Sequence, residues 1–198
     1  MTPSTTGPGA PETEQRILDV AIDVLGARPD AGMGDVAAAA GVVRRTVYGY
    51  FPTRADLVTA LARRAVDEIA RVLTTSHPPE VAADAAWADF VGRLWPVAHR
   101  YRVLIVLRRG EFGADIHAIL RPIETRLTEL VERGQRAGDF GDHLPADVLG
   151  QLAWSAVFTI ADGDRADRTV TVGAAVHSTL LLLGVTPDRA RSLAQDTT

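Results

Sequence analysis

Residues 41–51 read GVVRRTVYGYF, and the conformation of this stretch decides the fold of the N-terminal part of the chain. Its β-branched and aromatic residues favour a strand, but a lone strand between helices has no partner for its backbone groups. As a helix over residues 43–50, the stretch places its apolar residues on one side at positions i, i+4, i+7 and i+8. These residues are Val43, Val47, Tyr50 and Phe51. We therefore predict a short helix that packs through this side.

Helices are also predicted on both sides of the stretch. Apolar residues from Ile17 to Leu25 recur at helical spacing and predict a helix over residues 13–27. The alanine-rich residues 34–40 predict a second short helix that ends at Gly41. Thr53 can cap a fourth helix with one apolar stripe that continues to Thr75. The stretch is thus the third of four predicted helices.

The outward side of this third helix is cationic, hydroxylic and aromatic. At about 100° per residue, Arg45 and Gly49 point away from the apolar side, while Arg44, Thr46 and Tyr48 flank it. Together with the preceding short helix and turn, this is the pattern of a helix-turn-helix, whose second helix can enter the major groove of DNA. Arginine can bind guanine or phosphate, and hydroxyl groups can bind phosphate. The alternative from these residues alone is a solvated face over an ordinary core.

Residues 15–69 resemble the tetracycline-repressor (TetR) family of bacterial transcription regulators. The resemblance rests on RILDVAIDVL (16–25), GDVAAAAGV (34–42), RRTVYGYF (44–51) and PTRADLVTAL (52–61). It implies a DNA-binding helix-turn-helix, with Arg54 at a basic position that contacts phosphate. The DNA-binding residues that it implies are Arg44, Arg45, Thr46, Tyr48, Gly49, Tyr50 and Arg54.

Three residues depart from the family pattern. Gly32 stands where Ser or Thr commonly caps the second helix, and Val43 stands where Ser or Thr commonly begins the recognition helix. Losing such a cap removes about 1 kcal/mol of helix stability. Gly49 replaces a larger residue that often reads bases, so we expect Arg45 to take over part of that contact.

The remainder of the chain is also predicted to be helical, which makes the fold class all-α. Helical patterns cover residues 81–109, with a break or kink expected at Pro96, and residues 116–137, 146–161 and 169–183. The segment SHPPE (76–80) reads as a joint, because paired prolines cannot continue a helix. The predicted organisation is a disordered tail (1–11), a DNA-binding domain (12–75) and an effector-binding and dimerisation domain (80–198).

For this larger domain the resemblance implies an effector pocket and a dimer surface. A mixture of aromatic and polar residues is the candidate lining of an apolar pocket with a few polar anchors. We further suppose that Arg121, together with Trp95 and His99, suits an anionic ligand. The candidate ligand residues are Trp87, Trp95, His99, Arg102, Phe112, His117, Arg121 and Trp154.

Two long apolar stripes near the C-terminus are the candidate dimer interface. Their alternative is a core within one chain, and small residues permit close packing either way. A dimer would supply two reading heads for half-sites about 34–36 Å apart. The candidate interface residues are Leu149, Leu152, Ala153, Ala156, Val157, Val172, Val176, Thr179, Leu180 and Leu183.

Composition excludes several other classes of protein. The sequence has no cysteine, which removes thiolate metal sites, and its five histidines show no paired metal spacing. The segment GMGDVA (32–37) follows a helix instead of a strand, so it is not a dinucleotide fingerprint. No signal peptide or membrane span is evident, and a cytoplasmic location is expected. The net charge is −4, but five arginines and one acid lie between residues 40 and 64.

These observations predict a bacterial DNA-binding regulator, a homodimeric repressor that an unknown small molecule releases from its operator. We predict no enzymatic activity, catalytic residue, metal site or cofactor. The main alternative is a helical scaffold whose N-terminal module binds another protein, and a helical hydrolase or a metal sensor is a minor one.

Overall fold

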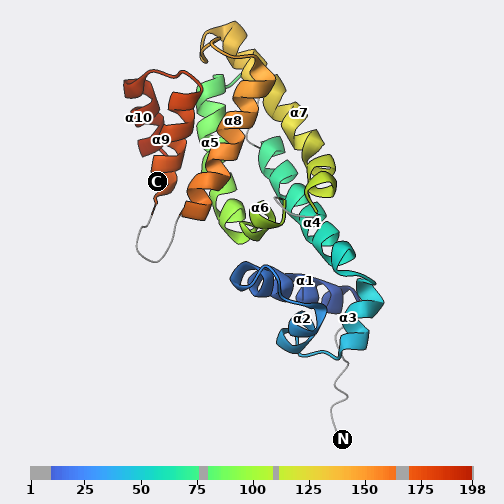
Figure 1. The fold of residues 1–198 in the computed structure, drawn as a ribbon. Helices are drawn as coiled ribbons and strands as arrows, with labels where there is room; N and C mark the ends of the chain where they lie inside the picture. Colours follow the sequence, from blue (N-terminus) through green and yellow to red (C-terminus); the bar gives the residue numbers. More distant parts are fainter. Residues whose placement is uncertain (1–9, 76–79, 109–111, 164–169, 198) are drawn as a thin grey trace, which may run out of the picture.

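The computed structural model describes residues 10–75, 80–108, 112–163 and 170–197, and within these ranges the regular structure is entirely helical (Figure 1). The prediction of an all-α fold is thus confirmed. Most of the predicted tail, residues 1–9, and most of the joint, residues 76–79 of 76–80, lie outside the described ranges, whereas residues 10 and 11 of the predicted tail belong to the first helix. The helices are α1 (Ala10–Ala27), α2 (Met33–Ala39), α3 (Arg44–Tyr50), α4 (Arg54–Thr75), α5 (Ala83–Arg100), α6 (Val103–Arg108), α7 (Gly113–Ala137), α8 (Ala146–Gly163), α9 (Val172–Leu182) and α10 (Pro187–Gln195).

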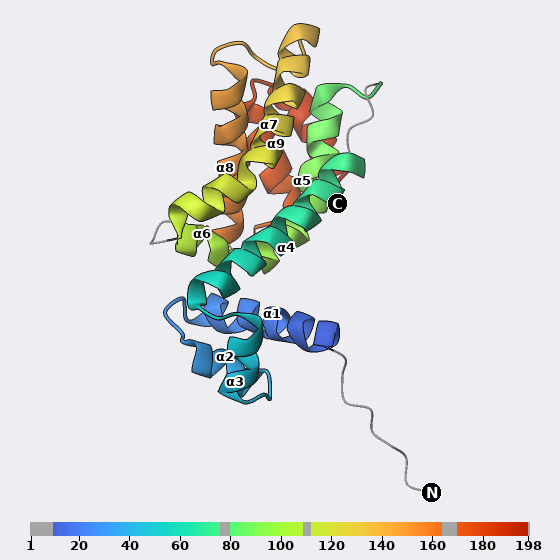
Figure 2. The same cartoon turned by 90° about the vertical axis from the view of Figure 1, so that its right-hand side faces the viewer.

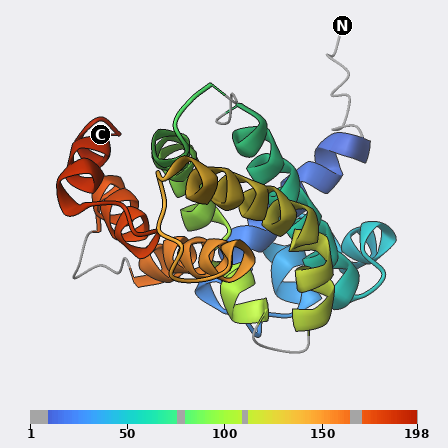
Figure 3. The same cartoon turned by 90° about the horizontal axis from the view of Figure 1, so that it is seen from above.

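Helices α1, α2 and α3 form a small head at one end of the molecule, and α4 runs from this head into the larger body (Figures 1 and 2). Helix α4 has 22 residues, which corresponds to roughly 33 Å at the usual rise per residue. In the body, α7 and α8 lie side by side, with α9 and α10 toward one edge (Figure 3). A single helix therefore connects the two parts.

Two elements differ from the predicted pattern. Pro96 lies inside α5 without ending it, and the chain turns at Tyr101 and Arg102 before α6 begins. The chain therefore does not leave the helix at Pro96, because packing of the apolar face of α5 stabilises the helix on both sides of the proline. Helix α10 was not predicted from the sequence. It begins with Pro187 in its first turn and packs on α9 through Ala190 and Leu193.

The buried side chains form two clusters that do not follow the predicted domain boundary. The cluster around α1 to α3 also contains Tyr101, Phe112 and Ile116 from the body. Conversely, Ile69 and Leu73 of α4 belong to the body's cluster. The core of the head is thus completed by the corner where α6 and α7 meet.

Candidate nucleic-acid interface and internal cavity

Helix α3 presents the predicted reading surface to solvent. Arg44, Arg45, Tyr48 and Gly49 are exposed, and Thr46 is half-buried. On the opposite side Val47 is fully buried in the cluster of the head. The outward strip is therefore cationic and hydroxylic, as the helical spacing predicts.

The apolar side of α3 is shorter than predicted. Val43 is 67% exposed, so its predicted packing was wrong. Val43 has extended backbone and precedes the helix as its N-cap, so the helical spacing does not apply to it. Tyr50 is half-buried against the head's core, with its ring beside that of Phe51. Tyr50 thus contributes to packing more than to the outward strip.

The first turn of α2 holds Arg44 in place. A Cβ atom at Gly34 would lie 2.3 Å from Nη2 of Arg44, so the guanidinium rests directly against this glycine. The Asp35 carboxylate accepts a hydrogen bond from the Gly32 amide (2.8 Å) and another from Arg28 (3.2 Å). These two donors hold the pKa of Asp35 below its usual value. Asp35 thereby caps α2, although Gly32 has no side chain to do so.

Arg54 is turned toward the protein. It donates to the carbonyl oxygen of Pro29 through Nη2 and to that of Ala31 through Nε (3.4 Å). The centre of its guanidinium lies 5.4 Å from the ring centroid of Phe112. The side chain is half-buried, so its position differs from that of the exposed arginines of α3.

An internal cavity of about 180 Å³ lies at the junction of the two clusters. Helix α4 forms one wall, and α8 contributes aromatic and hydroxyl groups to another. Among the described residues, its lining includes no arginine, histidine or acidic residue. The lining residues are Ala62, Ala65, Ile69, Val97, Tyr101, Leu104, Ile116, Leu120, Trp154, Ser155, Phe158 and Thr159.

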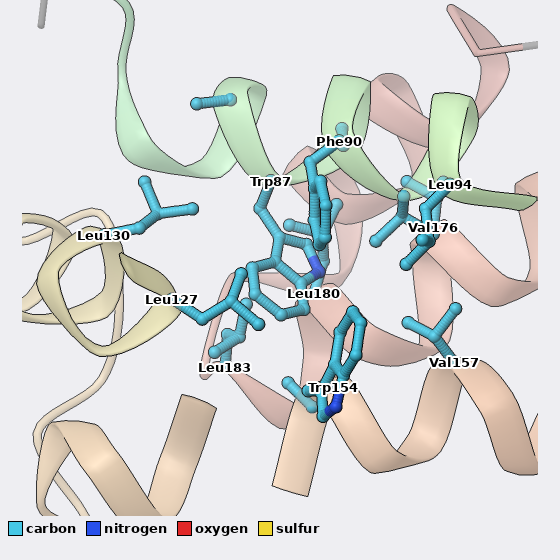
Figure 4. Packing of buried hydrophobic residues seen from close by; sticks show 14 of the residues in the cluster. Trp87, Phe90, Leu94, Leu127, Leu130, Trp154, Val157, Val176, Leu180 and Leu183 are labelled. Carbon is cyan, nitrogen blue, oxygen red and sulfur yellow. The ribbon is translucent and has the colours of Figure 1, made fainter. Parts of the chain in front are cut away.

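Of the eight predicted ligand residues, Trp154 alone lines this cavity. Trp87 is instead a core residue whose Nε1 donates to Thr179, and Figure 4 shows it among packed aliphatic side chains. Arg102, His117 and Arg121 are exposed. Trp95 and His99 pack against each other on α5, and Phe112 lies beneath Arg54. Aromatic composition did not separate core from lining, because both environments favour the same side chains.

Tyr101 connects the cavity to α4. It lines the cavity, and its hydroxyl donates to Oε1 of Glu68 (2.8 Å). Burial, followed by this bond to a carboxylate, raises the pKa of Tyr101 to about 12. The contact joins the turn before α6 to the helix that leads into the head.

The predicted dimer stripes lie mostly inside the protomer. Seven of the ten residues are buried within a single chain, so their assignment to an interface was wrong, and Figure 4 shows four of them packed around Trp87 and Phe90. Leu152 is 49% exposed, and Ala156 and Val172 are half-buried. The buried seven are Leu149, Ala153, Val157, Val176, Thr179, Leu180 and Leu183.

Large apolar side chains of α8 and α9, Leu152 of the predicted stripes among them, are exposed. Val148 and Leu152 on α8 are 41% and 49% exposed, and Leu181 and Leu182 on α9 are 40% and 44% exposed. The two helices pack against each other and run antiparallel, which places the start of α8 near the end of α9 (Figure 1). Sequence periodicity could not separate the two sides, because both sides of α9 are apolar.

Comparison with known proteins gives the class of this molecule. Residues 17–61 match the family model described as "Bacterial regulatory proteins, tetR family". The chain is 32% identical over 97 residues to TtgW, an HTH-type transcriptional regulator of Pseudomonas putida. The aligned residues are 48% of this chain and 69% of TtgW. The chain belongs to the TetR family of bacterial regulatory proteins. Proteins of the TetR family are DNA-binding transcriptional regulators, so the prediction of a DNA-binding regulator is confirmed. The alternative of a scaffold without DNA binding is not favoured.

The TetR family repressor LfrR of Mycolicibacterium smegmatis is 45% identical over 87 residues, which are 43% of this chain and 46% of LfrR. The sequence match therefore spans about half of LfrR. The crystal structure of LfrR from Mycobacterium smegmatis in complex with proflavine superposes on this chain with a TM-score of 0.67 and 26% identity. The superposition covers 96% of this chain and 98% of the LfrR chain.

The structure of FadR from Bacillus subtilis in complex with stearoyl-CoA has a TM-score of 0.73 at 20% identity, covering 87% of this chain and 98% of that chain. At this identity the likeness concerns the fold alone. None of the helices in the described residues is long and apolar enough to cross a membrane.

Proposed function

We propose that this TetR family protein is a homodimeric repressor that acts in the cytoplasm and leaves its operator when a small molecule enters the cavity. The observation that carries this proposal is the position of the cavity. It lies where the core of the head meets the core of the body, and α4, which enters the head, forms one of its walls. A ligand that fits one orientation of the head better than another would shift the population toward that orientation.

The DNA-contacting surface in this proposal is the outward side of α3. Arg44 and Arg45 supply forked donors for guanine or phosphate, and Thr46 and Tyr48 supply hydroxyl groups. Gly49 leaves an open position beside them, because nothing lies within 4 Å of the place where its Cβ would be. Base reading therefore depends mainly on the two arginines.

The lining of the cavity favours a compact, uncharged aromatic effector. Tyr101, Trp154 and Phe158 offer ring faces and edges, while the hydroxyls of Ser155 and Thr159 can orient one polar group. An apolar cavity of about 150 Å³ in another protein accommodates benzene, so this cavity suits a molecule of one or two rings. Within the part of the chain that the structure describes, the lining has no cation, and we therefore do not retain the predicted anionic ligand.

The dimer in this proposal forms through the outward sides of α8 and α9. Val148, Leu152, Leu181 and Leu182 are large apolar residues of these helices that are exposed. Burying them against the same residues of a second copy would give a two-fold interface, which is the commonest arrangement of soluble homo-oligomers. Of the predicted interface residues this proposal keeps Leu152, and it replaces the seven buried ones with Val148, Leu181 and Leu182.

DNA binding is tested with operators selected from random-sequence duplexes by the wild-type protein. We expect log affinity to fall linearly with log salt concentration, since phosphate contacts release counterions. Arg45→Ala should weaken binding by about 1–3 kcal/mol if Arg45 reads a guanine. Arg93→Ala, an exposed arginine of the body, is the matched control and should bind as the wild type does. Binding that is insensitive to salt and to Arg45→Ala would refute the proposal.

The effector class is tested by adding indole, a neutral two-ring molecule, or benzoate, an aromatic anion. Indole should reduce operator affinity by about fivefold or more, within the usual range of allosteric coupling. Benzoate should have no effect. Ser155→Phe fills the cavity and should remove the response to indole. Release by benzoate alone would refute the neutral class, and release by neither would contradict an effector of this chemistry.

A further inference from the structure

One guanidinium brings together three segments that are far apart in the sequence. Arg54 opens α4, and it donates to the carbonyl oxygens of Pro29 and Ala31 in the turn between α1 and α2. The same group lies over the ring of Phe112, which directly precedes α7. The head, the connecting helix and the body therefore meet at this one side chain.

These contacts are compatible because they use different parts of the group. The N–H donors of a guanidinium lie in its plane, whereas its faces can rest on an aromatic ring. Phe112 is buried, and the Arg54 side chain is half-buried. A partly desolvated cation over a buried ring interacts more strongly than an exposed pair does. The contact is thus suited to hold two elements in one orientation.

Phe112 is also one helical turn away from the cavity. The amide of Ile116 donates to the carbonyl oxygen of Phe112 (3.0 Å), so Phe112 is the N-cap of α7 and Ile116 lies in its first turn. Ile116 lines the cavity, and both side chains belong to the cluster of the head. A ligand that displaces the start of α7 would therefore move the ring on which Arg54 rests.

We propose that Arg54 is a positioning residue that, through Phe112, couples the cavity to the orientation of the head, and that it is not a phosphate contact. This inference rests on the proposed function, in which head orientation controls operator binding. In the ligand-free protein the contact holds the head in the orientation that binds DNA. Entry of a ligand moves Phe112, and the contact no longer favours that orientation.

The salt dependence of operator binding separates a positioning role from a phosphate contact. Arg54→Gln should weaken binding roughly two- to fivefold, as expected for loss of a cation–aromatic contact. The slope of log affinity against log salt should stay at its wild-type value, whereas loss of a phosphate contact would reduce it by about 1. Phe112→Leu should give the same loss, and the double variant should be no weaker than either single variant. A reduced slope in Arg54→Gln, or additive losses, would overturn the proposal.

The orientation of the head can be measured without DNA. Since the chain has no cysteine, spin labels can be placed at Ala38→Cys on α2 and Glu132→Cys on α7, both exposed positions. Dilution with unlabelled protein confines the measured distances to one chain, whatever the oligomeric state. We expect a broader distance distribution in Phe112→Leu than in the wild type, and a wild-type distribution in Phe112→Tyr, which keeps the ring. An unchanged distribution in Phe112→Leu would refute the coupling.

The two measurements distinguish the failure of this inference from the failure of the proposed function. If the wild-type protein binds no operator, the proposed repressor is wrong, while the distance distributions still decide whether Arg54 and Phe112 hold the head. Circular dichroism of each variant verifies that the helices remain folded. Arg63→Gln, an exposed arginine on the same helix, is the control for loss of charge on α4 and should leave the distribution unchanged.

Discussion

Thr179 provides the sharpest test of which side of α9 faces the core. Its hydroxyl accepts a hydrogen bond from Nε1 of Trp87 (3.0 Å) and lies within hydrogen-bond distance of the Ala175 carbonyl oxygen (2.9 Å). Both Thr179 and Trp87 are fully buried in a single chain. Thr179→Val keeps the shape of the side chain and removes its hydroxyl, which is both the acceptor for Trp87 and a donor to its own helix. The indole N–H of Trp87 is then buried without a partner.

An unsatisfied buried donor costs about 1–3 kcal/mol, and we expect the free energy of unfolding to fall by that amount. For a chain of this size each kcal/mol lowers Tm by about 2–4 °C. The measurement is denaturation followed by circular dichroism at several protein concentrations. Thr125→Val is the matched control, because Thr125 is exposed on α7 and its hydroxyl also donates to its own helix. It should change stability by less than about 0.5 kcal/mol.

A second variant on α9, compared with Thr179→Val, tests the proposed dimer surface. Leu182 is the third residue after Thr179 on α9 and faces outward. Leu182→Glu should weaken self-association in analytical ultracentrifugation and leave the stability of the isolated protomer nearly unchanged. Thr179→Val should do the reverse. If Thr179→Val weakened self-association without lowering protomer stability, our assignment of the two sides of α9 would be wrong.

Three further variants test the head, the cavity wall and the end of α7. Gly34→Ala should displace the Arg44 guanidinium and lower operator affinity, measured by anisotropy, while the melting temperature stays near that of the wild type. The pKa of Tyr101 is raised from about 10 to about 12, so the contribution of its neutral phenol to folding stability is complete below pH 10 and is lost as pH rises through 12. Absorbance at 295 nm should therefore show a phenol that titrates near pH 12, and Tyr101→Phe should remove this titration. Gly138 ends α7 with a φ of +79°, so Gly138→Ala should cost about 1–2 kcal/mol in chemical denaturation, and no loss would contradict the left-handed turn.

The reading head was predictable because its information is local. Helix α3 follows from the spacing of Val47 and Phe51 and from the absence of a strand partner, and the exposure of Arg45 follows from the same geometry. Val43 failed because a residue just before a helix does not share its periodicity. The inward turn of Arg54 was not predictable, since its three partners come from two other segments of the chain.

The sequence by itself determined that the chain is helical and that its N-terminal part contains a helix-turn-helix that carries arginines. It also determined that the protein belongs to a class of DNA-binding regulators. Only the tertiary structure decided which aromatic residues line the cavity and which side of α8 and α9 remains exposed. Helical periodicity specifies that a side is apolar, but not what covers it. Trp87 and Trp154 illustrate the difference: both are buried tryptophans, yet Trp154 lines the cavity and Trp87 fills the core, because the packing of α4, α7 and α8 leaves space beside only one of them.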